Sequence, residues 1–280
     1  MPVRVVTDSS AGLPADVIAQ LDITVLDLHV MDAEGKDGAV EHSTSGLSAL
    51  ELAAALGRQM ERSGDDGVLA LHLSREFSST WSAAVTASGV FPDTVRVIDS
   101  GTAGMVLGAA AMAAAKLAQD GADLQECYDA ALDTLSRGRT WVYVHSMEEL
   151  RKSGRMSTAT ALLSTALLAT KPIMAIEDGK LELVGKTRTQ TKAFTKVVEL
   201  VQERAQSQPC FVAIQHSGPA DAAEELRYLF EQVLAEGSTF MVLPLTEVVA
   251  VHTGAGALGI SVVFSTPPNE AVKKRNKLAF

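Results

Sequence analysis

Near its start the chain reads Val3-Arg4-Val5-Val6-Thr7-Asp8-Ser9-Ser10, an apolar run that ends in a polar cluster. Its length and its β-branched residues are typical of a buried strand. A second apolar run, Gly67 to Leu73, ends in the same way at Ser74. A helical pattern follows each run, and strands that alternate with helices indicate a parallel sheet with helices on both faces. We therefore predict an α/β fold whose first part is doubly wound.

The alternation continues to about residue 144 and then changes. Further strands are predicted at 23–30, 94–98 and 140–144, and helices at 14–21, 47–62, 80–89, 102–119 and 124–137. After Gly154 the turn pair Asp178-Gly179 predicts a β-hairpin. Two amphipathic helices (189–206 and 220–235) and three strands (210–215, 239–245 and 260–264) follow. The predicted organisation is a doubly wound domain over residues 1–153 and an α+β domain with a mixed or antiparallel sheet over 154–280.

Composition restricts the classes of function. The chain has 280 residues, 47% of them hydrophobic, and a net charge of −10. An acidic chain is repelled by phosphate backbones, so we expect no nucleic-acid partner. No apolar stretch reaches the length of a membrane span, and no signal-peptide core is visible, which predicts a cytoplasmic protein whose contact with membranes is at most transient. Cys127 and Cys210 lie far apart and the six histidines show no ligand spacing, so no metal is expected.

Two enzyme-like motifs fail on their context. The stretch from Gly254 to Gly259 matches the dinucleotide pattern G-x-G-x-x-G, but a strand pattern follows it where a helix is required. Gly185-Lys186-Thr187 resembles a phosphate-binding loop, yet its upstream glycine is one residue too distant and the intervening residues form an arm of the hairpin. No nucleophile-elbow motif occurs.

Small polar clusters end many of the apolar runs. They contain hydroxyls, one histidine and a few cations, which are suited to holding a negatively charged oxygen. In open α/β sheets the carboxyl ends of the strands form the ligand-binding edge, so Ser9, Ser78 and Ser100 are expected to share one rim. The clusters are Thr7 to Ser10, Ser43 to Ser45, Ser78 to Thr80, Ser153 to Arg155, Lys186 to Arg188 and His252 to Gly259.

The order of these clusters and the residues within them resemble the DegV family over the region from Arg4 to Phe264. The resemblance is carried by the opening Thr7-Asp8-Ser9-Ser10, by Ser153-Gly154-Arg155 and by the closing His252-x-Gly-x-Gly-Ala-Leu-Gly. Departures occur at Gly46-Leu47, where the family has Gln-Pro, and at Ser79 and Trp81, where it has Gly and Tyr. The other matching segments are Thr44-Ser45, Leu73 to Trp81, Glu149 to Met156, Lys171-Pro172-Ile173, Asp178-Gly179-Lys180 and Lys186-Thr187-Arg188.

This resemblance implies a non-enzymatic lipid carrier. The implied fold is an N-terminal Rossmann-like domain and a C-terminal α+β domain, with one long-chain fatty acid between them and no cofactor. Residues that match Thr44, Ser78 and His252 would hold the carboxylate, and a separate fatty acid kinase would receive the bound acid. We add Ser45 to the carboxylate site, and we place Ser9, Ser79 and Gly254 on a second polar rim. A buried carboxylate needs such donors, and His252 is expected to titrate near 6.5.

Cations and a channel complete the expected site. Arg155, Lys171 and Arg188 are predicted to lie near the channel mouth or to face the kinase, and surface ion pairs are the alternative for each. The Leu- and Ala-rich helix with Leu163, Ala166 and Leu167 is predicted to line the acyl channel, although an ordinary helix core fits the same pattern. Ser78 and Thr44 could equally cap the helices that follow them.

Two other classes of function remain open from the sequence. An enzyme acting on an acyl or phosphorylated small molecule would use Ser78 or Ser9 as nucleophile and His252 as base. It requires a carboxylate, Asp8 or Asp99, within hydrogen-bond reach of His252. A ligand-sensing interaction protein is the third class.

Overall fold

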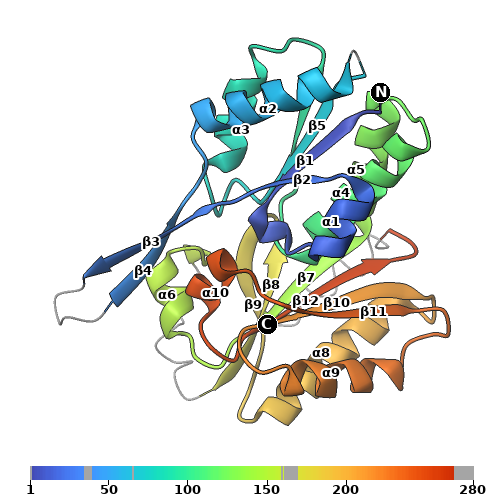
Figure 1. Cartoon of the computed structure of the whole chain (residues 1–280). Helices are drawn as coiled ribbons and strands as arrows, with labels where there is room; N and C mark the ends of the chain where they lie inside the picture. The colour runs from blue at the N-terminus through green and yellow to red at the C-terminus, as the bar shows by residue number, and fades with distance from the viewer. Residues whose placement is uncertain (1, 35–39, 65, 159, 161–169, 268–280) are drawn as a thin grey trace.

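Two β-sheets form the centre of the molecule (Figure 1). The computed structural model describes residues 2–34, 40–64, 66–158, 160 and 170–267. Within them no helix combines the length and the apolar character that crossing a bilayer requires.

The first sheet is parallel, with the order β2-β1-β5-β6. It consists of β1 (Arg4–Asp8), β2 (Thr24–Leu26), β5 (Val68–His72) and β6 (Val95–Asp99). Every residue of β1 and β5 is buried, as expected for strands covered on both faces. Figure 1 shows α2 (Ala49–Ser63) and α3 (Thr80–Ser88) on one face. The opposite face carries α1 (Ala15–Leu21), α4 (Met105–Gln119) and α5 (Leu124–Arg137). The doubly wound first sheet is thus present.

The second sheet is mixed, with the order β11-β10-β12-β7-β8-β9. Only β10 and β11 are parallel neighbours, and α8 (Gln190–Ala205) and α9 (Asp221–Glu231) pack against the sheet. Asp178 and Gly179 both have positive φ (48° and 82°), which is the two-residue turn expected between β8 and β9. Its strands are β7 (Gly138–Tyr143), β8 (Lys171–Glu177), β9 (Lys180–Thr187), β10 (Cys210–His216), β11 (Thr239–Pro244) and β12 (Leu258–Phe264).

One strand belongs to a different sheet from the one predicted. The run at 140–144 was expected to extend the parallel sheet, but β7 pairs antiparallel with β12 and β8. Local pattern identifies a strand but not its neighbours, and one neighbour of β7, the strand β12, lies more than a hundred residues later in the chain. The division of the chain at residues 153 and 154 remains a prediction, with β7 structurally part of the second sheet.

The predicted strand at 23–30 is divided between two structures. Its first part is β2, whereas β3 (His29–Glu34) pairs with β4 (Val40–Ser45) in a separate ribbon. Figure 1 shows this ribbon extending away from the two sheets. Its base is important for function because β4 ends with Thr44 and Ser45, and β4 contacts the short helix α10 (Glu247–Thr253).

Two short helices lie beside the base of the ribbon. They are α6 (Glu148–Ser153) and α10, and they contact each other. Neither was predicted, since six or seven residues show little periodicity. Helix α2 begins with a capping box: the Ser48 hydroxyl accepts a hydrogen bond from the Glu51 N–H, and the Glu51 carboxylate accepts one from the Ser48 N–H.

Candidate functional site

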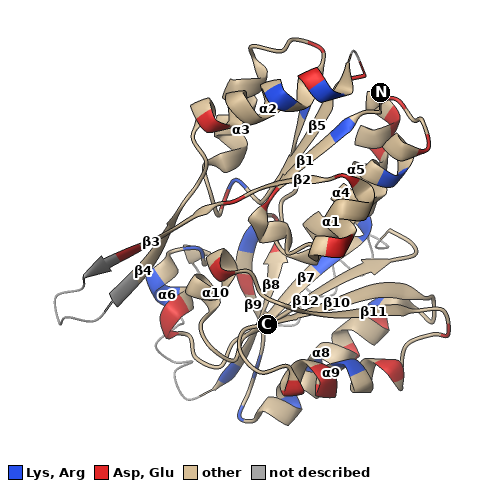
Figure 2. Ribbon diagram, viewed as in Figure 1, with Lys and Arg blue, Asp and Glu red and all other residues tan. Residues whose placement is uncertain are grey.

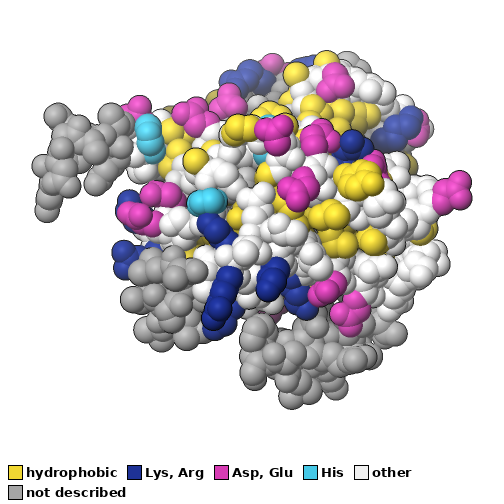
Figure 3. Space-filling view, turned by 90° about the horizontal axis from the view of Figure 1, so that it is seen from below, with side chains coloured by type: hydrophobic (Ala, Val, Ile, Leu, Met, Phe, Trp, Pro, Cys, Tyr) yellow, Lys and Arg dark blue, Asp and Glu magenta, His cyan; other side chains and the backbone are white. Residues whose placement is uncertain are grey.

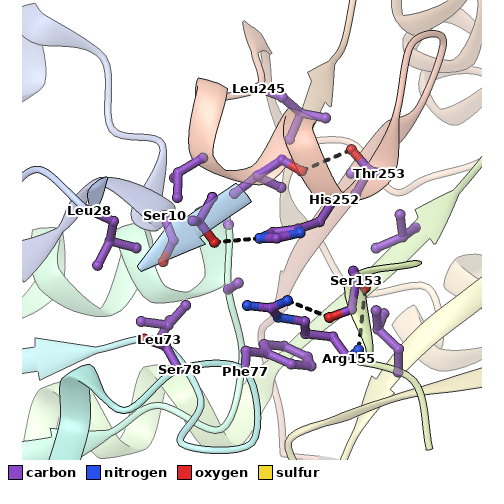
Figure 4. A pocket seen from close by; sticks show the side chains of 18 of the residues that line it. Ser10, Leu28, Leu73, Phe77, Ser78, Ser153, Arg155, Leu245, His252 and Thr253 are labelled. Carbon is purple, nitrogen blue, oxygen red and sulfur yellow. Dashed lines mark hydrogen bonds between the residues drawn. The ribbon is translucent and has the colours of Figure 1, made fainter. Parts of the chain in front are cut away.

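A cavity of about 390 Å³ lies where the two halves of the chain meet (Figure 4). A volume of this size falls within the range of small-molecule sites. Most of its wall is apolar, and many of its polar residues come from β4, from the loop before α3, from α6 and the residues just after it, and from α10. The lining side chains include Ser10, Thr44, Ser45, Leu73, Phe77, Ser78, Ser79, Val142, Arg155, Ile176, Leu181, Gln215, Val248 and His252.

Thr44 and His252 meet across the cavity from segments 208 residues apart. Thr44 Oγ1 lies 2.7 Å from His252 Nε2. Burial of the imidazole, with a further contribution from the positive charge of Arg155, lowers the pKa of His252 from 6.5 to about 4. The ring is therefore neutral at pH 7, whereas the sequence suggested a ring that titrates near 6.5. A neutral ring and a hydroxyl form a hydrogen-bonding pair without a net charge.

A second pair of hydroxyls lies at the start of α3. Ser78 Oγ is 2.9 Å from Thr80 Oγ1, and Thr80 Oγ1 accepts a hydrogen bond of 3.2 Å from the Leu47 N–H. Gly46 permits this arrangement, because a Cβ there would lie 2.7 Å from both hydroxyl oxygens. Ser78 also accepts a hydrogen bond from the Thr80 N–H and lines the cavity, whereas the N-cap position of α3 is held by Ser79, whose side chain forms no capping bond.

Arg155 is the cation of the cavity. Its guanidinium donates to the carbonyl oxygen of Ser153, and burial lowers its pKa. No carboxylate of the described residues contributes to that pKa or forms an ion pair with Arg155. Figure 4 shows its side chain beside Phe77, reaching toward the space that His252 faces. Arg155 lines the cavity, and its predicted place near the channel mouth stays a prediction.

The residues of the proposed catalytic triad do not come together in the described part of the chain. Asp8 is fully buried and accepts hydrogen bonds from Ser10 Oγ (2.5 Å) and the Leu73 N–H (3.0 Å), with His72 Nδ1 at 3.1 Å. Asp99 accepts from the N–H groups of Arg75 and Gly101. Neither carboxylate forms a hydrogen bond with His252, so no carboxylate of the described residues orients the ring as a base.

Six of the residues selected from the sequence line the cavity. They are Thr44, Ser45, Ser78, Ser79, Arg155 and His252.

Other selected residues lie elsewhere. Ser9 Oγ accepts a hydrogen bond from the Leu28 N–H, Gly254 packs near Glu149, Lys171 donates to the His145 carbonyl oxygen, and Arg188 is exposed. Ser100 donates to the Thr102 carbonyl oxygen and is absent from the lining, so the rim expected for Ser9, Ser78 and Ser100 is not formed as predicted. Leu163, Ala166 and Leu167 lie outside the described residues.

Sequence reasoning missed two polar groups of the wall. Ser10 follows Ser9 in the same cluster. The sequence does not show which of the two serines lines the cavity, because the position of the Ser10 hydroxyl depends on the hydrogen bond that it donates to Asp8. Gln215 is 2% exposed and accepts a hydrogen bond from the Met105 N–H at the start of α4. Nothing in the local sequence marks Gln215, because the two contacting segments are 110 residues apart.

Both enzyme-like motifs have structural explanations. After Gly254 and Gly256, which have φ of 77° and 76°, the chain enters β12 and not a helix. Lys186 and Thr187 end β9. Among the described residues no group of three or more His, Cys, Asp or Glu side chains is placed to hold a metal ion.

Comparison with known proteins identifies close relatives. A family model described as "uncharacterised protein, DegV family" matches residues 2–265. A DegV domain-containing protein of Corynebacterium glutamicum is 57% identical over 271 residues, covering 96% of this chain and 97% of its own. The crystal structure of a DegV family protein from that species superposes with a TM-score of 0.91, covering 95% of this chain and 99% of its own.

Two more distant structures carry a ligand class in their descriptions. A fatty-acid-binding DegV family protein from Thermus thermophilus is 27% identical, with a TM-score of 0.85 and coverage of 94% and 100%. DegV of Bacillus subtilis, described as a fatty acid binding protein, is 28% identical, with a TM-score of 0.82 and coverage of 95% and 100%.

Proposed function

This chain belongs to the DegV family, and we propose that it binds one long-chain fatty acid in the cavity and presents it to a separate fatty acid kinase. In this proposal Thr44, Ser78 and His252 donate hydrogen bonds to the carboxylate, and Arg155 supplies the opposite charge. The fatty-acid-binding relatives support the ligand class, and the cavity residues support the orientation of the ligand.

The observation that carries the proposal is the unpaired cation in the wall. A desolvated guanidinium is costly unless an anion compensates its charge. Arg155 has a carbonyl oxygen as its partner, and no carboxylate of the described residues pairs with it. Uncharged donors, the Thr44 hydroxyl and the neutral His252 ring, lie in the same wall. One cation surrounded by neutral hydrogen-bonding groups matches one carboxylate.

The apolar wall provides a reason for a long acyl chain. Leu73, Val142, Ile176, Leu181 and Val248 are among the lining residues. At ~0.8 kcal/mol per buried methylene, a chain of about 15 methylenes gains on the order of 12 kcal/mol before the entropic costs of binding. The carboxylate contacts then determine orientation and discriminate the acid from uncharged lipids.

Native mass spectrometry tests the binding step. We expect the purified protein to carry or take up one palmitate or oleate, and Thr44→Val with Ser78→Ala to weaken retention by about tenfold or more, because charge-assisted hydrogen bonds are lost. Thr86→Val with Ser88→Ala is the matched control, since the exposed Thr86 and the half-buried Ser88 carry hydroxyls of α3 that donate to carbonyl oxygens of their own helix. A protein that takes up no fatty acid, or a cavity double variant that retains it as well as the control does, contradicts the proposal.

Presentation to a kinase is supported by exposed cations near the end of β9. Lys186 and Arg188 are exposed, and Figure 2 shows blue segments at the end of β9 and at the start of α8. Figure 3 shows several Lys and Arg side chains gathered on the side of the molecule that faces down in Figure 1. Such a cluster suits docking of an acidic surface or of a phosphate-bearing protein.

Phosphoryl transfer tests the kinase step. We expect Arg188→Glu to leave palmitate binding unchanged and to slow phosphorylation of bound palmitate by the fatty acid kinase of the same organism. Arg58→Glu, at an exposed position of α2, is the charge-matched control. Equal phosphorylation rates for the two variants would exclude the end of β9 as the docking surface.

A further inference from the structure

The carboxylate of Glu182 in β9 accepts hydrogen bonds from two buried hydroxyls in the segment that follows Arg155. Ser157 Oγ donates to Glu182 Oε2 at 2.8 Å, and Thr160 Oγ1 donates to the same oxygen at 3.2 Å. Ser157 and Thr160 are 9% and 3% exposed, and their hydroxyls are 3.1 Å apart. Among the described residues Glu182 forms no ion pair, so its charge is compensated by hydroxyl donors. Glu182 itself is half-buried, and a carboxylate that accepts from two hydroxyls is held by hydrogen bonds to its charged form.

The backbone of the same segment is joined to β9 beside Glu182. Met156 forms an isolated parallel bridge with Leu181, and the Ser157 N–H donates to the Leu181 carbonyl oxygen at 3.1 Å. The Thr160 hydroxyl also accepts from the Leu183 N–H at 3.3 Å. Met156, Ser157 and Thr160 are thus fixed to β9 through both backbone and side chains, with Glu182 on the chain between Leu181 and Leu183.

Arg155 lies between this attachment and a turn. On its N-terminal side Gly154 ends α6 with φ of 68°, a left-handed conformation that favours glycine. On its C-terminal side Met156 and Ser157 are held on β9. No acidic side chain of the described residues holds the guanidinium itself. The position of Arg155 in the cavity wall is therefore determined by the backbone on either side of it.

From this geometry we infer that Glu182 is a positioning residue for Arg155: by fixing Ser157 and Thr160 to β9, it holds the guanidinium where a carboxylate in the cavity meets it. The inference rests on the proposed function, because Arg155 has a role only if the ligand is an anion. Glu182 acts through hydrogen-bond acceptance and not through its charge. Removing its acceptor oxygen releases the segment, whereas replacing the carboxylate by an amide keeps a carbonyl oxygen for both hydroxyls.

The test measures discrimination between an acid and an uncharged lipid of the same length. The ratio of the affinities for palmitate and hexadecanol is determined by competition in native mass spectrometry, so that losses common to both ligands cancel. We expect Arg155→Met to lower the ratio by roughly tenfold or more. Glu182→Ala should lower it by roughly three- to tenfold, and Glu182→Gln should remain within about twofold of the natural protein. Glu177→Ala, at an exposed end of β8, is the matched control and should have no effect.

A double-mutant cycle separates positioning from a general structural role. If Glu182 acts through Arg155, Glu182→Ala should not change the ratio in a protein that already carries Arg155→Met. An equal decrease in both backgrounds overturns the inference, as does an unchanged ratio for Glu182→Ala in the otherwise natural protein. Should Glu182→Ala fail to fold, Ser157→Ala removes one of the two hydroxyls and must lower the ratio. A natural protein that does not prefer palmitate to hexadecanol refutes the proposed function instead, which keeps the two failures distinct.

Discussion

The buried imidazole of His252 makes the lipid-free protein sensitive to acid. Its pKa is about 4 in the folded state against 6.5 ordinarily, because burial and the Arg155 charge both disfavour the protonated ring. The unfolded chain therefore binds this proton more readily. The contribution of the neutral His252 ring to the stability of the folded state is complete above about pH 6.5. It is lost progressively as the pH falls toward 4. Linkage gives a loss of about 2 kcal/mol between pH 7 and pH 5, which we reduce to about 1 kcal/mol because the half-buried ring is partly screened by water.

Denaturant titration of the natural protein and of His252→Gln measures this loss. Glutamine can keep a hydrogen bond to Thr44 but does not titrate in this range. We expect the midpoint of His252→Gln to fall less between pH 7 and pH 5, by the equivalent of about 1 kcal/mol. His145→Gln is the control, since that side chain is exposed. Bound palmitate should reduce the acid sensitivity, because its carboxylate raises the pKa of His252. Identical slopes for the natural protein and His252→Gln would refute the neutral buried ring.

Two substitutions test the close approaches that shape the site. Gly46→Ala places a Cβ 2.7 Å from the hydroxyls of Ser78 and Thr80, so we expect about 1 to 3 kcal/mol of destabilisation in denaturant titration and weaker palmitate binding. An unchanged stability with unchanged binding would show that α3 can move away freely. Gly179→Ala combines a positive φ of 82° with a Cβ 2.6 Å from Ser74 Oγ, which donates to the Gly179 carbonyl oxygen. The unfolding midpoint of Gly179→Ala should fall by the equivalent of about 1 to 3 kcal/mol. A fall of only a few tenths of a kcal/mol would contradict a tight contact between Gly179 and Ser74.

Local patterns in the sequence were sufficient for much of the fold. The buried strands β1 and β5 and the Asp178-Gly179 turn each depend on residues within a few positions of one another. The sheet-edge argument was less successful, because of Ser9, Ser78 and Ser100 only Ser78 lines the cavity. Thr44, Ser78 and His252, which the family resemblance indicated, all line the cavity, and their part in binding remains a prediction.

The features that were missed are those determined by distant contacts. β7 joins the second sheet because β12, more than a hundred residues later, provides its neighbour. The pKa of His252 depends on burial and on Arg155, and neither can be read from the residues beside it. The place of Arg155 in the cavity wall depends on the attachment of Met156, Ser157 and Thr160 to β9, which no local pattern reveals.

The charges of the cavity restrict the ligand further than its shape does. Arg155 is the one cation of the described wall, and His252 is neutral at pH 7. An uncharged lipid, such as an ester or an alcohol, would leave the buried guanidinium without a counter-ion, so part of the gain from burying its chain would be lost. A phosphate group with two charges would exceed the single cation and would favour protonation of His252. A carboxylate balances the wall as it stands, because its one charge meets Arg155 while its remaining lone pairs accept hydrogen bonds from neutral donors. This balance favours the free fatty acid over its neutral and phosphorylated derivatives as the resident ligand.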